Sequence, residues 1–218
     1  MLHKKQNVQS LLVALCTCVA LSSCAHTEIM NTWRDPGYEA TPKRVLVHMI
    51  ARNPTAKAML ENQFAEQFEK RGMVAFASYN YLADQLFIDK EAMKKLVMEK
   101  QIDTLLVGAP TNRKDLESLR PGQMSYGTAV YQNTDEDFYA AVSAYTYQPG
   151  TYAEEEVASE IVVFDVKTRR RVWTALAKTY ISNTKAQEVA PAVKQIMELL
   201  VRDRIVPASA GTGSGSGR

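Results

Sequence analysis

Between residues 45 and 107 the chain alternates short apolar runs with amphipathic stretches. The apolar runs lie at 45–50, 74–77 and 104–107, and the amphipathic stretches follow Pro54 and Asp89. Short apolar runs rich in β-branched residues predict buried strands. In the first amphipathic stretch Leu60, Phe64 and Phe68 recur every fourth residue, so they share one face of a helix. The order strand–helix–strand–helix–strand predicts parallel strands joined by right-handed crossovers.

The residues at the ends of the first amphipathic stretch also fit a helix. Thr55 is a candidate N-cap, because its side-chain oxygen can accept a hydrogen bond from a backbone N–H. Lys70 and Arg71 suit the negative end of the helix dipole. Gly72 suits the left-handed conformation that often follows a helix. These residues predict a helix that begins near Pro54 and ends before Gly72.

The second half of the chain has a different pattern. Residues 110–137 carry prolines, glycines and many polar residues, which predicts a long loop. Extended runs follow at 138–147, 157–166 and 172–181, and a short polar turn between the last two predicts an antiparallel hairpin. A helical apolar stripe over 185–204 predicts a final helix, with Pro191 in its first turn or at a kink. The chain therefore reads as a single α/β domain with a mixed sheet of about six strands: a βαβαβ unit, a hairpin region and a carboxy-terminal helix.

The amino-terminal segment has the order of features found in a lipoprotein signal peptide. Lys4 and Lys5 precede an apolar run from residue 11 to 21, which ends in Leu21-Ser22-Ser23-Cys24. That run is shorter than the roughly 20 residues that a membrane-spanning helix needs. The small residues before Cys24 fit a narrow protease cleft, and its thiol can carry a lipid. An ordinary secretory signal and an uncleaved hydrophobic amino terminus are the alternatives.

These features divide the chain into four predicted parts. Residues 1–23 form a signal peptide, and residues 24–42 form a polar, lipidated tether. Residues 43–205 form the mixed α/β domain. Residues 206–218 form a flexible tail rich in glycine and serine.

Short motifs occur in an order that resembles a family of uncharacterised Gram-negative outer-membrane lipoproteins. They are the Leu21–Cys24 lipobox, Trp33-x-Asp35-Pro36, the 45–50 run, Lys70-Arg71-Gly72 and the hairpin around 164–173. The resemblance implies that Cys24 is acylated, becomes the mature amino terminus and anchors the protein. Ala25 after the cysteine resembles the outer-membrane class, which implies a lipid-anchored protein of the outer membrane that faces the periplasm.

Charge and cysteine usage narrow the function classes. The chain has 218 residues, 46% of them hydrophobic, with 26 Lys+Arg against 24 Asp+Glu. Residues 1–23 contain two lysines and no acid, so the rest carries 24 basic and 24 acidic side chains. This balance excludes a generally cationic nucleic-acid binder. Cys16 and Cys18 leave with the signal peptide, so the covalent lipid on Cys24 is the only expected cofactor.

Residues suited to catalysis or metal binding are few. His48 lies inside the first predicted strand, where a core or sheet-face histidine is favoured over a catalytic one. The acidic runs 135–137 and 154–156 lack the spacing of a calcium loop, and a solvated face is favoured over a calcium site. We therefore expect neither a catalytic residue nor a metal site.

Tyrosines concentrate in one segment. They are Tyr126, Tyr131, Tyr139, Tyr145, Tyr147 and Tyr152. On an extended 138–147 run, alternation puts Tyr139, Tyr145 and Tyr147 on one face. Tyrosine has a flat apolar ring and a hydroxyl, which suits a partner or glycan surface. The segment is either such a binding surface or a set of rings that cover the sheet beneath a helix or the long loop.

The polar turn of the hairpin is the one concentrated positive feature. It contains Lys167, Arg169, Arg170 and Arg171. These cations either contact an anionic surface, such as lipid headgroups or peptidoglycan carboxylates, or simply point into water. The sequence as a whole predicts a non-enzymatic envelope lipoprotein that binds or assists another envelope protein or peptidoglycan. The alternative is an envelope enzyme, or a small-ligand or glycan-binding protein, with a site under the 110–137 loop.

Overall fold

A computed structural model describes residues 27–39, 41–51, 53–82, 89–110, 138, 139, 142, 156–180 and 186–208. Its strands are β1 (Thr27–Arg34), β2 (Arg44–Met49), β3 (Val74–Ala77), β4 (Thr104–Pro110), β5 (Glu156–Asp165) and β6 (Arg170–Tyr180). Its helices are α2 (Pro54–Glu69), the 3-10 helix η1 (Ser78–Asn80), α3 (Lys90–Glu99) and α6 (Ala186–Arg202). The predicted signal peptide, Cys24, residues 111–137 and residues 209–218 of the predicted tail lie outside these residues. The tail boundary predicted at residue 206 is wrong, because Val206 is 5% exposed and packs in the core.

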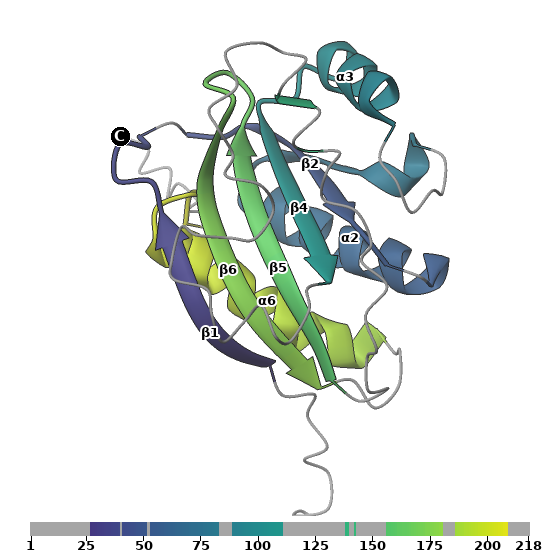
Figure 1. Cartoon of the computed structure of the whole chain (residues 1–218), viewed down its shortest axis with the longest axis vertical. Coiled ribbons are helices and arrows are strands. Elements are labelled where there is room, and N and C mark those ends of the chain that lie inside the picture. Colours follow the sequence, from purple (N-terminus) through teal and green to yellow (C-terminus); the bar gives the residue numbers. More distant parts are fainter. Residues whose placement is uncertain are drawn as a thin grey trace, which may run out of the picture.

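The six strands form one mixed sheet in the order β1-β6-β5-β4-β2-β3 (Figure 1). β2 pairs in parallel with both β3 and β4, whereas the β4–β5, β5–β6 and β6–β1 pairs are antiparallel. The prediction of a single α/β domain with a mixed sheet of about six strands is thus confirmed, including the parallel unit and the β5–β6 hairpin.

The strand directions give the sheet two distinct ends. At one end, which we call the hairpin end, the turn 166–169 joins β5 to β6, β1 finishes, and β2, β3 and β4 begin. At the other end, which we call the β1-start end, β1 begins and β2, β4 and β6 finish. The candidate functional features are divided between these two ends.

Helices cover both faces of the sheet (Figure 1). α2 and α6 pack on one face, where Phe64, Trp173 and Leu200 belong to the same core. α3 packs on the other face, where Met93 joins Phe138 in a second core. The chain moves outward from β2 to β3 and then returns past β2 to β4, so it reverses its direction across the sheet at β3, and α2 and α3 lie on opposite faces.

The helix ends largely follow the predicted signals. Gly72 has a φ of 78°, as expected of a left-handed residue after a helix, and Asp89 caps α3. The N-cap of α2, however, is Asn53 rather than Thr55. Its side-chain oxygen accepts hydrogen bonds from the backbone N–H groups of Thr55 (2.9 Å) and Ala56 (3.3 Å). Pro54, whose missing N–H costs nothing at the first helical position, leaves the cap to the residue before it.

The tether predicted for residues 24–42 is wrong where the structure describes it. Thr27–Arg34 form β1, an edge strand that pairs with β6 from Thr27↔Thr179 to Arg34↔Trp173. Ile29 packs against the core, and Tyr38 is buried in it. An edge strand with one partly exposed face carries many polar residues, so its sequence looked like a linker. The domain therefore begins at or before Thr27.

The strand predicted over 138–147 is also wrong for its described residues. Phe138, Tyr139 and Val142 are helical and buried. The rings of Phe138 and Phe164 contact edge to face at a centroid distance of 6.0 Å. Residues four apart share one face of a helix, and residues 138 and 142 also share one face of a strand, so the apolar pattern fitted both.

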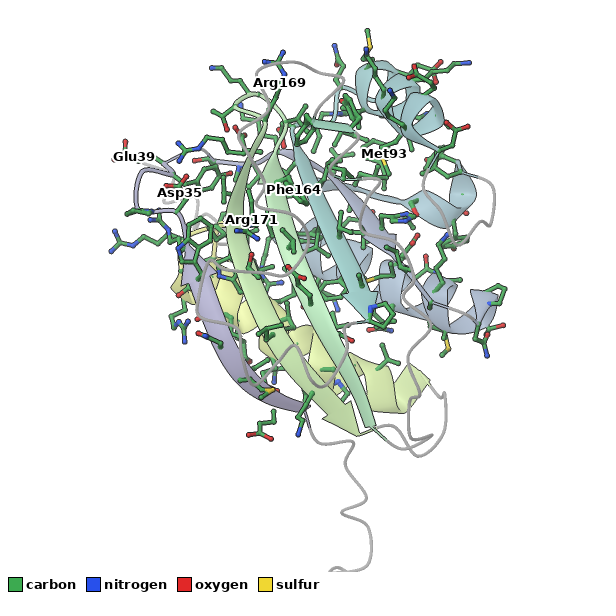
Figure 2. The ribbon with its side chains drawn as sticks, in the orientation of Figure 1. Asp35, Glu39, Met93, Phe164, Arg169 and Arg171 are labelled. Atoms are coloured by element: carbon green, nitrogen blue, oxygen red, sulfur yellow. The ribbon has the colours of Figure 1, made fainter. Side chains whose placement is uncertain are left out.

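The motif Trp33-x-Asp35-Pro36 fastens the end of β1 to the hairpin. Asp35 is 5% exposed. Its carboxylate accepts a hydrogen bond from the Gly37 N–H (2.9 Å) and forms an ion pair with Arg170 (2.8 Å). The Arg171 guanidinium lies 5.5 Å from the centre of the Trp33 ring. Figure 2 shows Asp35 near the end of β1 and Arg171 on β6. The motif is therefore part of the folded domain.

We expect Asp35→Ala to lower the free energy of unfolding by about 1–3 kcal/mol, because the Gly37 N–H loses its acceptor and Arg170 loses its ion pair with Asp35. Glu39→Ala is the matched control, since Glu39 is an exposed acid four residues away and its loss changes stability by less than about 0.5 kcal/mol. Urea denaturation of both variants measures the difference. Equal stability of the two would show that β1 is not fastened to the hairpin in this way.

Candidate functional site

The polar residues most suited to chemistry meet where β2 and β3 finish. His48 lies near the end of β2, and Ser78 directly follows β3. Lys57 and Glu61 lie one turn apart on α2. All four side chains are buried, with exposed fractions of 4% or less. Parallel strands bring their carboxyl ends to one edge of the sheet, so residues distant in sequence form one buried polar cluster.

Glu61 is the centre of this cluster. One carboxylate oxygen accepts hydrogen bonds from the Met49 N–H (2.9 Å) and the Ser78 hydroxyl (2.8 Å). The other oxygen accepts from the Tyr79 N–H at 2.9 Å. A single side chain on α2 thus satisfies backbone donors at the end of β2 and in η1. This bonding ties three elements together at the edge where the parallel strands end.

The hydrogen bonds fix the direction of the protons. The Ser78 hydroxyl has one proton, which it donates to Glu61, so its oxygen accepts from His48. The His48 Nδ1–H therefore donates to Ser78 Oγ, 2.7 Å away. In a hydrolase the imidazole would instead take the proton from serine. The three groups resemble a catalytic triad in composition, but here the histidine donates a proton to the serine oxygen and the serine donates to the carboxylate.

Burial sets the charge state of the cluster. It lowers the pKa of His48 from 6.5 to about 3, and the nearby Lys57 cation adds to this shift, so the imidazole is neutral at physiological pH. Burial also raises the pKa of Glu61, although its three hydrogen bonds and Lys57 pull in the other direction. The histidine is neutral, and the serine both donates and accepts a hydrogen bond within the cluster. Both residues are shielded from solvent, so their hydrogen bonds are made to other protein groups.

The structure confirms the prediction that His48 is a core residue. Ser78 and Glu61 are each 0% exposed, so no substrate atom reaches the serine oxygen or the carboxylate in this conformation. Within the described ranges, no group of three or more His, Cys, Asp or Glu side chains is placed to hold a metal ion. In those same ranges, no helix is long and apolar enough to cross a membrane.

Lys57 and Glu61 were not predicted from the sequence, although a signal was present. Residues 57, 61, 64 and 68 recur at helical spacing, so the two charged residues share the buried face of Phe64 and Phe68. A charged residue in a buried stripe is found only where partners satisfy it. For Glu61 those partners are Met49 on β2 and Ser78 and Tyr79 just after β3, which no local pattern reveals.

Of the six tyrosines proposed as a binding surface, only Tyr139 lies in the described part of the chain. It is 4% exposed and its ring contacts Phe138 at a centroid distance of 5.0 Å. The burial of Tyr139 fits the alternative in which these rings cover the sheet, whereas the strand expected at this residue is wrong, because the backbone at residues 138 and 139 is helical. Tyr126, Tyr131, Tyr145, Tyr147 and Tyr152 lie outside the described residues.

The basic turn is partly used within the domain. Arg170 pairs with Asp35, and Arg171 lies over the Trp33 ring. Arg169 adopts a positive φ of 56° in the turn, and Figure 2 shows it at the tip of the hairpin. Lys167 is exposed. The turn is therefore both a structural clasp for β1 and a site where positive charge reaches the surface.

No protein-family model and no curated protein matches the sequence. Among solved structures, the chain is similar to a PelC dodecamer from Paraburkholderia phytofirmans, with 14% identity, a TM-score of 0.43, and coverage of 84% of this chain and 100% of that chain. A dodecamer of a PelC variant from the same organism gives 16% identity, a TM-score of 0.42, and coverage of 81% and 95%. Similarity at this level supports no statement about function or assembly.

Replacement of Glu61 by alanine should lower the free energy of unfolding by about 3 kcal/mol or more, because three buried donors lose their acceptor. Glu66→Ala is the control, since Glu66 is an exposed acid on the same helix that pairs with Lys70. Its expected cost is below about 1 kcal/mol. Chemical denaturation compares the two, and a cost for Glu61→Ala no larger than that of the control would contradict the assigned role.

His48 should make the protein less stable in acid. Its pKa is about 3 in the folded protein and 6.5 when unfolded, so below pH 6.5 only the unfolded chain gains the proton. Stability therefore falls by up to about 1.4 kcal/mol per pH unit from this group as the pH drops from 6.5 towards 3. Glu61 acts in the opposite direction, since its raised pKa makes protonation favour the folded state.

His48→Asn tests this, because its amide can still donate to Ser78 but does not titrate. We expect the variant to lose less stability than the wild type between pH 6.5 and pH 4, measured by denaturation at each pH. The same acid slope in both proteins would show that His48 is not the titrating group.

Proposed function

We propose that the protein is a lipid-anchored lipoprotein of the outer membrane that faces the periplasm, lacks catalytic activity and binds another envelope component. The anchor is Cys24, which follows the Leu21-Ser22-Ser23 motif and resembles the acylated cysteine of bacterial lipoproteins. Acyl chains bind a bilayer with about 0.8 kcal/mol per buried methylene, and more than one chain makes the attachment durable.

The observation that carries this proposal further is the short distance from Cys24 to the sheet. Only Ala25 and His26 separate the cysteine from β1, which begins at Thr27. The three residue steps from Cys24 to Thr27 span at most about 11 Å. A lipid on Cys24 would therefore hold the β1-start end of the sheet against the membrane instead of leaving the domain on a long leash.

The buried polar cluster supports the non-catalytic part of the proposal. His48, Ser78 and Glu61 are the residues that most resemble a hydrolase triad. Each of them is hydrogen-bonded to other groups of the domain. Their burial leaves binding, instead of chemistry, as the activity for which the described surface is suited.

A small-ligand, glycan-binding or enzymatic function remains the second candidate because of the topology. The chain winds in opposite directions from β2 and β4, and open α/β sheets bind ligands outside the carboxyl ends of strands at such a point. The 111–137 segment follows β4 at that place and lies outside the described residues. A ligand at this edge would lie at the β1-start end of the sheet.

The anchor is tested by Cys24→Ala, with Cys18→Ala as the matched control because Cys18 lies in the segment expected to be removed. The wild type and the control should incorporate labelled palmitate and fractionate with membranes. Cys24→Ala should lose the label and leave the membrane fraction. Membrane fractionation that is unchanged in Cys24→Ala, together with an unlabelled wild type, would refute the lipid anchor.

A further inference from the structure

Cationic side chains gather at the hairpin end of the sheet. We call the set Lys43, Arg44, Lys100 and Lys167 the basic rim. In the sheet register Thr104 of β4 pairs with Val45 on one side and with Asp165 on the other. Lys43 and Lys167 each lie two residues beyond this row, on the chains that flank β4. Two strand spacings separate them, or about 10 Å.

The rim continues to the edge of the sheet beside β3. The Arg44 Nε–H donates to the backbone oxygen of Lys100 at 2.6 Å, which joins the start of β2 to the end of α3. The Lys100 ammonium lies 5.0 Å from the centre of the Tyr81 ring. Tyr81 is 46% exposed, so a flat aromatic surface and a hydroxyl accompany the charges.

The carboxylates nearby are occupied by the backbone. Asp103, between the rim lysines, accepts from the backbone N–H groups of Lys43 (3.0 Å) and Arg44 (3.2 Å). Asp165 is 5% exposed and accepts from the Thr168 N–H at 2.8 Å to close the hairpin turn. Among the described residues, no carboxylate lies within ion-pair distance of Lys43 or Lys167. Asp103 and Asp165 therefore hold backbone groups, and the Lys43 and Lys167 ammonium groups have no ion-pair partner among the described residues.

The strand directions place the basic rim far from the proposed anchor. β1 starts beside Cys24 and runs for eight residues towards the hairpin end. At about 3.3 Å per residue, this separates the rim from the bilayer by roughly 26 Å. The screening length in physiological salt is about 8 Å, so the headgroups of the anchoring leaflet do not attract these cations. A partner of the rim must lie out from that membrane.

We propose that the basic rim binds the carboxylate-bearing glycan–peptide polymer of the cell wall. The inference rests on the proposed function, because the lipid anchor is what places the protein in the envelope and turns the rim away from the bilayer. From β3 to β5 the rim crosses three strand spacings, or about 15 Å, which suits an extended strand with repeated negative charges. Lys43, Lys100 and Lys167 contact carboxylates, and Tyr81 offers its ring to the sugar chain.

The test is co-sedimentation of the full chain, purified in detergent, with isolated peptidoglycan sacculi. The test variant is Lys43→Glu with Lys167→Glu. The matched control is Lys178→Glu with Lys194→Glu, which changes the charge equally on β6 and α6, away from the rim. Circular dichroism first establishes that both variants are folded. We expect the rim variant to bind at least about tenfold more weakly than wild type, and the control to change by less than about twofold.

Two further arms identify the ligand. Sacculi with amidated carboxylates should bind weakly, and raising the ionic strength from about 0.05 M to about 0.5 M should release the wild type. Vesicles that contain phosphatidylglycerol should bind less well than intact sacculi at equal charge. Wild type that fails to sediment with sacculi, a rim variant that binds as well as the control, or a preference for vesicles would each overturn the proposal and favour a protein or lipid partner.

The Cys24→Ala variant separates this inference from the proposed anchor. Binding to sacculi needs no lipid, so the variant should sediment as the wild type does. If the membrane experiment refutes lipidation while sacculi still bind through Lys43 and Lys167, the rim stands and the anchor falls. If lipidation holds and the rim variant binds normally, the anchor stands and the rim falls.

Discussion

The pairing of β1 with β6 is the constraint on which the rest of this account depends. It makes residues 27–34 the edge of the sheet, and Asp35 then secures the end of that strand through Gly37 and Arg170. Residues 27–34, which were predicted to belong to a flexible tether, are therefore part of the folded sheet. If Cys24 is acylated, only two residues remain between lipid and sheet, so one strand fixes which end of the molecule faces the membrane and which faces away.

A second constraint acts at the other end of the sheet, where Glu61 accepts hydrogen bonds from β2, η1 and Ser78. A buried carboxylate is costly unless it is fully bonded, and here its bonds hold together elements that are far apart in sequence. His48 and Ser78, which resemble catalytic residues, thus form hydrogen bonds within the folded domain. At the hairpin end, Asp103 and Asp165 accept hydrogen bonds from the backbone, while Lys43 and Lys167 are exposed.

The parts of the fold that could be predicted are those with strong local signals. Buried parallel strands and amphipathic helices have a characteristic spacing of apolar residues, as Leu60, Phe64 and Phe68 show for α2. Gly72 and Asp89 indicated helix ends. Edge strand β1 could not be recognised, because most of it is only partly buried and most of its residues are polar. The helix at Phe138 and Val142 was mistaken for a strand because a spacing of four fits both. Glu61 and the basic rim depend on strand register, which joins residues that no local pattern connects.

We propose that the β1-start end of the sheet lies against the membrane and that the hairpin is the part of the domain farthest from it. The most direct measurement is the distance from the hairpin tip to the bilayer, by energy transfer from a dye on Lys167→Cys to headgroup acceptors after the lipidated protein is inserted into vesicles. The account predicts a separation of roughly 26 Å or more, set by the length of β1. A dye at the headgroups, quenched as strongly as one placed on the lipid itself, would contradict it.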